Sequence, residues 1–151
     1  MRPAIALCAL LTALAAGSAQ ALEYKSVGAD PVVAYDAPGM KGRKMFAVPR
    51  GMPVETILSY GDWTKVRDSA GDLFWLESKS LTGKRTLVVK AANARIHAAA
   101  DDASPLAFSA DKGVLLDMAE PAGASAAGWI KVKHRDGQVG YAKTGEVWGG
   151  D

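Results

Sequence analysis

The sequence predicts an all-β protein made of two tandem small β-barrels behind a secretory leader. A tryptophan-bearing segment at 62–76 returns at 128–142, which indicates that one structural unit is used twice. Short runs rich in β-forming residues follow one another, each bounded by Gly, Pro, Asp or Asn. After the leader, no segment longer than about ten residues keeps a helical period with a clean apolar face, so we expect no long helix.

Residues 1–21 have the three parts of a signal peptide, which we expect to be helical. Arg2 supplies the positive start, an apolar run covers 4–16, and Ala19 and Ala21 form a small-x-small cleavage site. The apolar run is too short to cross a bilayer. We therefore expect cleavage after Ala21, no stable membrane span in the product, and a secreted, periplasmic protein.

The two copies align with one change of offset. The offset is 62 residues before the tryptophan segment and 66 within it, and it changes inside 119–128. Insertions collect in exposed loops, because loop closure costs little extra entropy as a loop lengthens. The predicted units are 22–85 and 86–151. Their short junction at 81–85 has no flexible linker composition, so we expect the two barrels to touch.

Each unit is expected to contain about five short strands, as in a small barrel. In the first unit the predicted strands are Tyr24–Val27, Val32–Tyr35, Val54–Leu58, Trp63–Arg67 and Leu73–Leu76. In the second they are Thr86–Val89, Ala94–His97, Gly113–Met118, Trp129–Lys133 and Val139–Ala142.

Alternation along the tryptophan strands predicts which side chains face the core. Val66 in the first unit, and Ile130 with Val132 in the second, share one face, whereas the tryptophan and two basic residues share the other. A face that mixes an aromatic ring with cations is expected to be half-exposed. Asp136-Gly137 after the second of these strands predicts a tight hairpin.

Charge and cysteine content exclude several classes of function. The formal net charge is +2, and one of the positive residues is Arg2 of the leader, which argues against nucleic-acid binding. The single cysteine, Cys8, also lies in the leader, so we expect neither a disulfide nor a catalytic thiolate after cleavage.

The order of these motifs resembles the bacterial SH3-like (SH3b) domain, twice over. In each copy a basic residue and Gly precede an apolar strand, followed by a Trp-x-Lys-Val strand, a Gly turn and a closing aromatic-aliphatic pair. The resemblance implies a barrel of five or six strands with a 3₁₀ turn near 78–81 and 144–148. It also implies a non-catalytic binding module of exported or envelope proteins, often directed at peptides or the cell wall.

The resemblance also assigns candidate ligand-binding residues. Trp63 and Trp129 match the aromatic residue that lines the ligand groove, and Trp75 and Tyr141 match the second aromatic. Tyr35 belongs to the first-strand motif, which survives in part at 33–39 and dissolves at 95–100. We therefore favour the first repeat as the binder. The alternative for both groove tryptophans is structural, with the indole covering one barrel end and its N–H bonded to backbone. Trp148 is expected to close the second barrel.

Two short strings match motifs of penicillin-recognising enzymes: Ser109-Ala110-Asp111-Lys112 fits S-x-x-K and Lys143-Thr144-Gly145 fits K-T-G. Those enzymes need the serine at a helix start, a third motif and a far larger fold, so we expect no enzyme. The two histidines, His97 and His134, are expected to be exposed or structural. His97 with Asp101 and Asp102 lacks a recognised metal-ligand spacing, so no metal and no other cofactor is predicted.

Two functions remain in view. The first is an exported, non-catalytic module that binds a peptide, a protein partner or a cell-wall component such as peptidoglycan in the envelope. The second is a structural subunit of an envelope assembly, in which the aromatic groove packs one repeat against the other.

Overall fold

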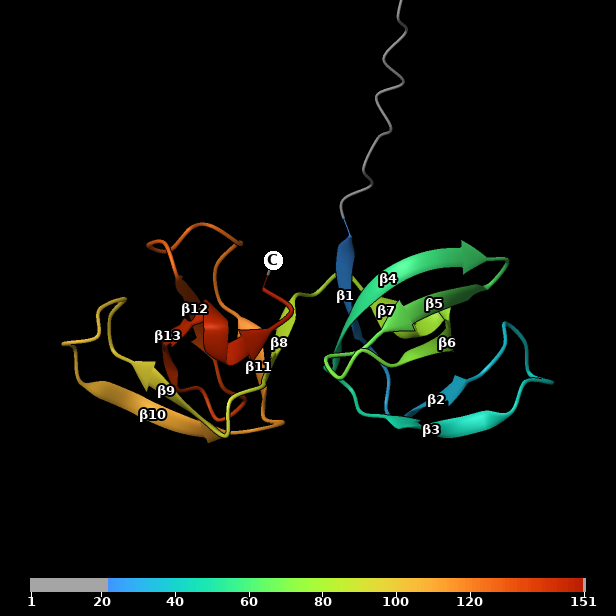
Figure 1. Ribbon diagram of the computed structural model, residues 1–151, viewed down its shortest axis with the longest axis horizontal. Coiled ribbons are helices and arrows are strands. Elements are labelled where there is room, and N and C mark those ends of the chain that lie inside the picture. The colour runs from blue at the N-terminus through green and yellow to red at the C-terminus, as the bar shows by residue number, and fades with distance from the viewer. Residues whose placement is uncertain (1–21, 151) are drawn as a thin grey trace, which may run out of the picture.

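The structure is a computed structural model, and it describes residues 22–150. These residues form two seven-stranded antiparallel sheets, each curled into a small barrel (Figure 1). The first contains β1 (Glu23–Val27), β2 (Val32–Tyr35), β3 (Lys44–Val48), β4 (Pro53–Tyr60), β5 (Trp63–Arg67), β6 (Leu73–Glu77), η1 (Ser78–Ser80) and β7 (Leu81–Thr82). The second contains β8 (Thr86–Val89), β9 (Asn93–His97), β10 (Leu106–Asp111), β11 (Leu115–Met118), β12 (Trp129–Lys133), β13 (Val139–Lys143), η2 (Thr144–Glu146) and β14 (Val147–Trp148).

The two sheets have the same topology. The strand order is β3-β2-β6-β5-β4-β1-β7 in the first and β10-β9-β13-β12-β11-β8-β14 in the second, so every strand has a counterpart in the other repeat. The register also shifts at the same place in both, between Ala34 and Tyr35 and between Leu106 and Phe108. The predicted fold class of two tandem SH3-like barrels is confirmed, and the predicted signal peptide lies outside the described residues.

Four interior strands were predicted with their observed bounds, whereas the edge strands were missed. The bounds of β2, β5, β8 and β12 are those predicted from the sequence. Four strands were not predicted from the sequence, namely β3, β10 and the two-residue strands β7 and β14. The first four residues of β3 are all exposed, so that strand has no buried face to produce an alternating pattern. No helix within 22–150 is long and apolar enough to cross a membrane.

The predicted alternation agrees with the core. In β5 the burial alternates, with Trp63, Lys65 and Arg67 half-buried and Thr64 and Val66 buried. The first core cluster consists of Val27, Val32, Ala34, Val48, Val54, Val66, Phe74 and Leu76. The second consists of Leu87, Val89, Ala94, Ile96, Ala110, Leu116, Ile130, Val132, Ala142 and Val147.

Turns follow the predicted chemistry. The 3₁₀ turns expected before the last strands are present as η1 and η2. In the predicted hairpin, Gly137 has φ +95°, a conformation that a side chain disfavours. The Asp136 carboxylate accepts a hydrogen bond from the Gln138 N–H at 2.9 Å, which holds this turn.

The repeats differ in packing where Phe74 of β6 corresponds to Gly140 of β13. Phe74 is buried and packs edge-on against Phe46, with ring centroids 5.0 Å apart. At Gly140, an added Cβ would lie 2.6 Å from Ile96 Cγ2 and 2.8 Å from the His97 carbonyl oxygen. Only glycine therefore lets β13 approach β9 this closely.

The two repeats contact each other through residues that were not predicted to lie at the junction. The Tyr24 and Trp148 rings meet edge-on at 5.3 Å, and the Arg85 guanidinium lies 5.3 Å from the Tyr24 ring centroid. Arg85 also donates to the Gly149 carbonyl at 2.7 Å, and Lys84 pairs with Asp117 at 3.0 Å. Trp148 belongs to β14 and pairs with β8 as a closing residue of the second barrel, but its ring also contacts the first repeat.

Replacing Gly140 with Ala is expected to destabilise the second repeat, because the new methyl group overlaps a buried side chain and a backbone oxygen. Overpacking of this kind costs about 1–3 kcal/mol of unfolding free energy. Urea unfolding followed by circular dichroism measures it. Gly145→Ala is the matched control, because its Cβ would meet nothing within 4 Å. Equal unfolding midpoints for the two variants would contradict this packing.

Replacing Tyr24 with Ala removes the ring contact between the repeats. We expect a loss of about 0.5–1.5 kcal/mol beyond the area term, the usual worth of an edge-on aromatic pair. Tyr60→Ala is the matched control, since Tyr60 is 68% exposed. If both variants unfold at the same urea concentration, Tyr24 contributes nothing at the junction.

Candidate functional site

Three of the five predicted site residues come together at one end of the first barrel. Tyr35 ends β2 and Trp63 begins β5, and their rings meet edge-on at 5.2 Å with an interplanar angle of 85°. Trp75 lies on β6 between these strands, and in register it is paired with Tyr35 on one side and Lys65 on the other. We call Tyr35, Trp63 and Trp75 the aromatic groove of repeat one.

The two tryptophans of this aromatic cluster are partly accessible and have polar neighbours. Tyr35 is buried, whereas both tryptophans are half-buried. Tyr60 and Glu77 are paired with Trp63 on the neighbouring strands. Glu77 bonds Lys79 at 2.9 Å, which raises the pKa of that lysine. Partly exposed aromatic rings with polar neighbours suit an amphipathic ligand.

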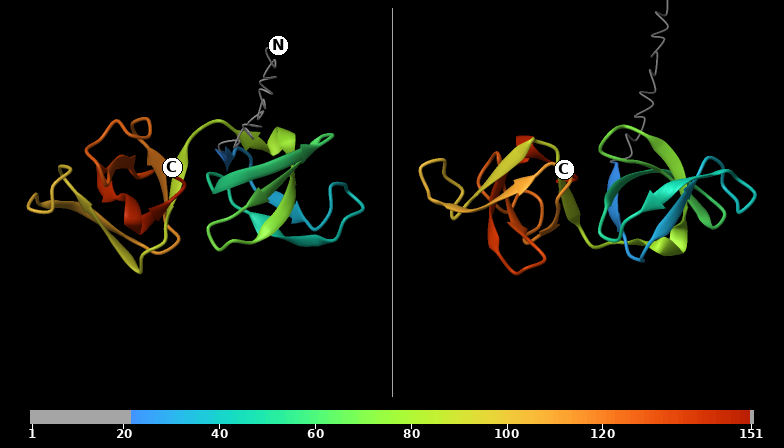
Figure 2. Two further views of the ribbon diagram at one scale, coloured as in Figure 1. Left: turned by 45° about the horizontal axis from the view of Figure 1, so that its top comes forward. Right: turned by 90° about the horizontal axis from the view of Figure 1, so that it is seen from below.

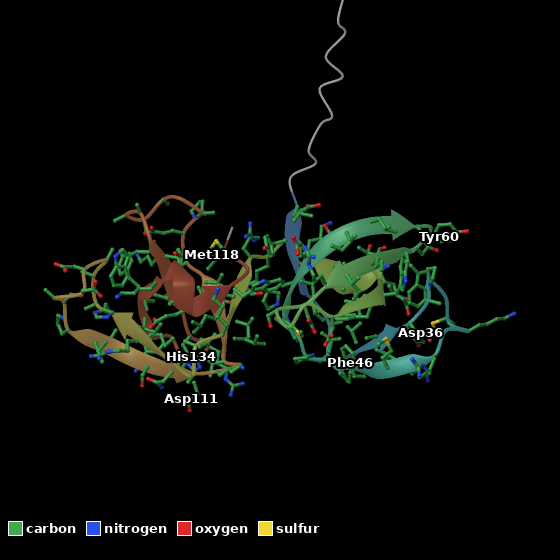
Figure 3. The ribbon with its side chains drawn as sticks, viewed as in Figure 1. Asp36, Phe46, Tyr60, Asp111, Met118 and His134 are labelled. Carbon is green, nitrogen blue, oxygen red and sulfur yellow. The ribbon has the colours of Figure 1, made fainter. Side chains whose placement is uncertain are left out.

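The groove faces away from the second repeat. Asp36, which follows Tyr35, and Tyr60 both lie at the outer end of the first repeat in Figure 3. The ring contact between the repeats is made by Tyr24 and Trp148 instead. The second sequence hypothesis required the groove residues to pack one repeat against the other. The ring contact between the repeats is instead made by other residues.

The indole N–H groups of Trp63 and Trp129 are not used for structural hydrogen bonds. Neither makes a hydrogen bond within residues 22–150, and neither is among the buried unpaired polar atoms of that range. The structural alternative for these residues required a bond from the indole to the backbone. Without it, each indole keeps a free donor for a ligand.

The second repeat has the same arrangement with one substitution. His97 ends β9 and meets the Trp129 ring edge-on at 5.3 Å and 84°, as Tyr35 meets Trp63. Tyr141 lies between them on β13, paired in register with His97 and Lys131. The remaining two predicted residues, Trp129 and Tyr141, thus also come together. His97 was not predicted as a member, although the offset of 62 places it opposite Tyr35.

His97 is held firmly in place. It is 6% exposed, and its Nδ1–H donates to the Ser104 carbonyl at 3.1 Å. A ring nitrogen that bonds a carbonyl carries the proton, so in the neutral ring Nε2 is an acceptor. The sequence prediction of a structural histidine is correct in this respect, but the residue also forms one wall of the second aromatic pair.

Two lysines lie over the aromatic rings of the second repeat. Lys131 Nζ is 5.9 Å from the Tyr141 ring centroid and 3.2 Å from the Glu120 carboxylate, and hydrogen bonding to Glu120 raises its pKa. Lys143 Nζ is 5.7 Å from the Trp129 ring centroid and 2.6 Å from Asp102. The position of Lys143 is occupied by Glu77 in the first repeat, so the charge beside the tryptophan has the opposite sign there.

The structure does not assemble the enzyme-like strings into a catalytic site. Ser109 lies in the edge strand β10, paired with Arg95, and not at the start of a helix. Lys143 and Thr144 lie at the junction of β13 and η2. Within 22–150 no group of three His, Cys, Asp or Glu side chains could hold a metal ion.

The hydrogen bond from Lys143 lowers the pKa of the Asp102 carboxyl below its usual value. The stabilisation from this pair is therefore present at neutral pH and is lost as the pH falls through the folded-state pKa. Carbon-detected NMR titration of the carboxyl group measures the midpoint. Lys143→Met should return it toward the ordinary value, whereas Lys131→Met should leave it unchanged. An unchanged midpoint in Lys143→Met contradicts the assignment.

Comparison with known proteins gives one family. The sequence model of the family described as bacterial SH3 domain matches twice, at residues 28–83 and 89–149. No curated protein matches the chain.

Two solved structures are similar in part. They are NlpC1 from Trichomonas vaginalis, with 16% identity, a TM-score of 0.38 and coverage of 89% of this chain and 48% of that one, and NlpC2 from the same organism, with 16% identity, a TM-score of 0.38 and coverage of 86% and 49%. The chain thus spans about half the length of these two proteins.

Proposed function

The chain belongs to the bacterial SH3 domain family, and from that premise we propose that it is an exported binding protein of the cell envelope. Its ligand is an extended peptide or the peptide part of the cell wall. The aromatic groove of repeat one holds this ligand. Domains of this family are binding modules and are generally not catalytic. The leader expected at 1–21 supports export to the periplasm.

One observation carries the choice of site. Trp63 stands half-buried against the buried Tyr35, at 5.2 Å, with its indole N–H unpaired within 22–150. Tyrosine and tryptophan supply a large, stiff contact area with a polar tip, which suits recognition of an extended chain. Tyr35 is already buried against the Trp63 ring in the free protein, so little entropy is lost there when a ligand binds.

The proposal predicts that Trp63→Ala loses binding to the envelope. The protein is mixed with purified peptidoglycan sacculi and the bound fraction is measured by sedimentation over a range of concentrations. Loss of an aromatic anchor of at least about 2 kcal/mol corresponds to roughly a thirtyfold weaker affinity.

Trp129→Ala is the matched control, because it makes the same substitution at the equivalent place in the second repeat. It should keep most of the affinity. Equal loss of binding in both variants would contradict a site confined to repeat one. Equal retention of wild type and Trp63→Ala on sacculi would overturn the proposal for this ligand. In that case retention of peptides from an envelope extract tests the partner-peptide form of the proposal.

A further inference from the structure

The second repeat contains a cavity in which every lining residue is ionisable. The cavity has a volume of about 210 Å³. Its side chains come from β9, the loop after it, the end of β13 and η2, and they are Arg95, His97, Asp102, Lys143 and Glu146. We call this cavity the charged pocket. It adjoins Trp129, because the His97 ring packs on that indole and Lys143 lies over it.

The first repeat shows that the fold does not require these charges. With the offsets of 62 and 66, the same five places in repeat one are Val33, Tyr35, Met40, Glu77 and Ser80. Only one of them, Glu77, is charged at neutral pH. The two barrels have the same strand order and register shift, so the charges of the pocket are a property of repeat two and not of the barrel.

The pocket combines charges of both signs, and not all of them are paired. Lys143 and Asp102 form an ion pair at 2.6 Å. Glu146 Oε2 accepts a hydrogen bond from the backbone N–H of Arg95 at 3.3 Å. The Arg95 guanidinium makes no ion pair within the described residues. An open guanidinium therefore lies beside a carboxylate that has accepted only one, neutral donor.

A ligand of one sign does not suit this arrangement. A simple anion would approach Arg95 but would be repelled by Glu146 and Asp102, and a simple cation would meet the opposite conflict with Arg95 and Lys143. A ligand with an ammonium and a carboxylate on the same carbon matches both. Arginine binds carboxylates in a bidentate manner, and Glu146 together with the acceptor Nε2 of His97 offers oxygen and nitrogen acceptors for an ammonium.

We infer that the charged pocket of repeat two binds an α-amino-acid head group, with the ligand carboxylate on Arg95 and the ammonium on Glu146 and His97. The head group belongs to a free amino acid or to one carried at the end of a peptide through its side chain. This site does not rest on the aromatic groove of repeat one, because it lies in the other barrel and recognises charge.

The test is an NMR titration of the ¹⁵N-labelled full-length protein at pH 7, following the amides of Arg95, His97 and Glu146. The probes are alanine, which is a free amino acid, and γ-glutamylglycine, which carries the same head group on a peptide. N-acetylalanine lacks the ammonium and alaninamide lacks the carboxylate. We expect saturable shifts with alanine, with γ-glutamylglycine or with both. Both blocked forms should bind with at least tenfold lower affinity.

Two substitutions borrow the residues that repeat one has at the same places, so the barrel is expected to tolerate them. Arg95→Val and Glu146→Ser should each weaken the binding at least tenfold, whereas Arg135→Val, at an exposed arginine in the β12–β13 hairpin, should leave it unchanged.

Binding of alanine identifies a free amino acid as a source, and binding of γ-glutamylglycine alone identifies a peptide. Absence of saturable shifts with both probes would overturn the proposal. Equal binding of the blocked forms would overturn it too, as would unchanged affinity in Arg95→Val and Glu146→Ser. Because the aromatic groove is tested by sacculus binding of Trp63→Ala, failure of either experiment leaves the other result standing.

Discussion

The first strand of each repeat joins its fourth strand to its last, and the rest of the structure depends on this pairing. β1 pairs with β4 on one side and with the two-residue β7 on the other, and β8 pairs in the same way with β11 and β14. Val27 and Val89, at the ends of these first strands, are each 1% exposed and belong to the two cores. The only cysteine, Cys8, precedes both barrels, so within 22–150 hydrophobic burial and strand pairing act without a disulfide.

The shared strand order gives the aromatic pairs the same geometry, while the side chains set their chemistry. The Tyr35–Trp63 and His97–Trp129 pairs agree to within 0.1 Å in centroid distance, at 5.2 and 5.3 Å, and their angles are 85° and 84°. Since the same backbone frame holds both pairs, a change from phenol to imidazole and from Glu77 to Lys143 alters polarity without moving the frame. Duplication of one barrel thus gives two aromatic pairs in different polar surroundings on one chain.

Structural features that produce a local pattern in the sequence were predicted from it. Strand β5 alternates between buried and half-buried residues and was predicted with its bounds, whereas β3 presents four exposed residues in succession and was missed. The aromatic residues of both sites were found through the resemblance. His97 was not, because its counterpart Tyr35 is a different residue type, and this difference was taken to place His97 outside the scaffold that the repeats share. The Tyr24–Trp148 contact joins the two ends of the described chain, and no local pattern records such a contact. Export remains a prediction, since residues 1–21 lie outside the described range.

The arrangement of the two barrels determines how the sites can be used. The hairpin between β2 and β3, next to Tyr35, and the hairpin between β9 and β10, which carries Asp102, point to opposite ends of the molecule in all views (Figures 1 and 2). The contacts of Tyr24, Arg85 and Trp148 join the two repeats between these ends. The two proposed sites would therefore take separate ligands, or separate parts of one long ligand. For a polymeric ligand that reaches both ends, the second contact would form at a high effective concentration, so weak individual sites would suffice for firm attachment.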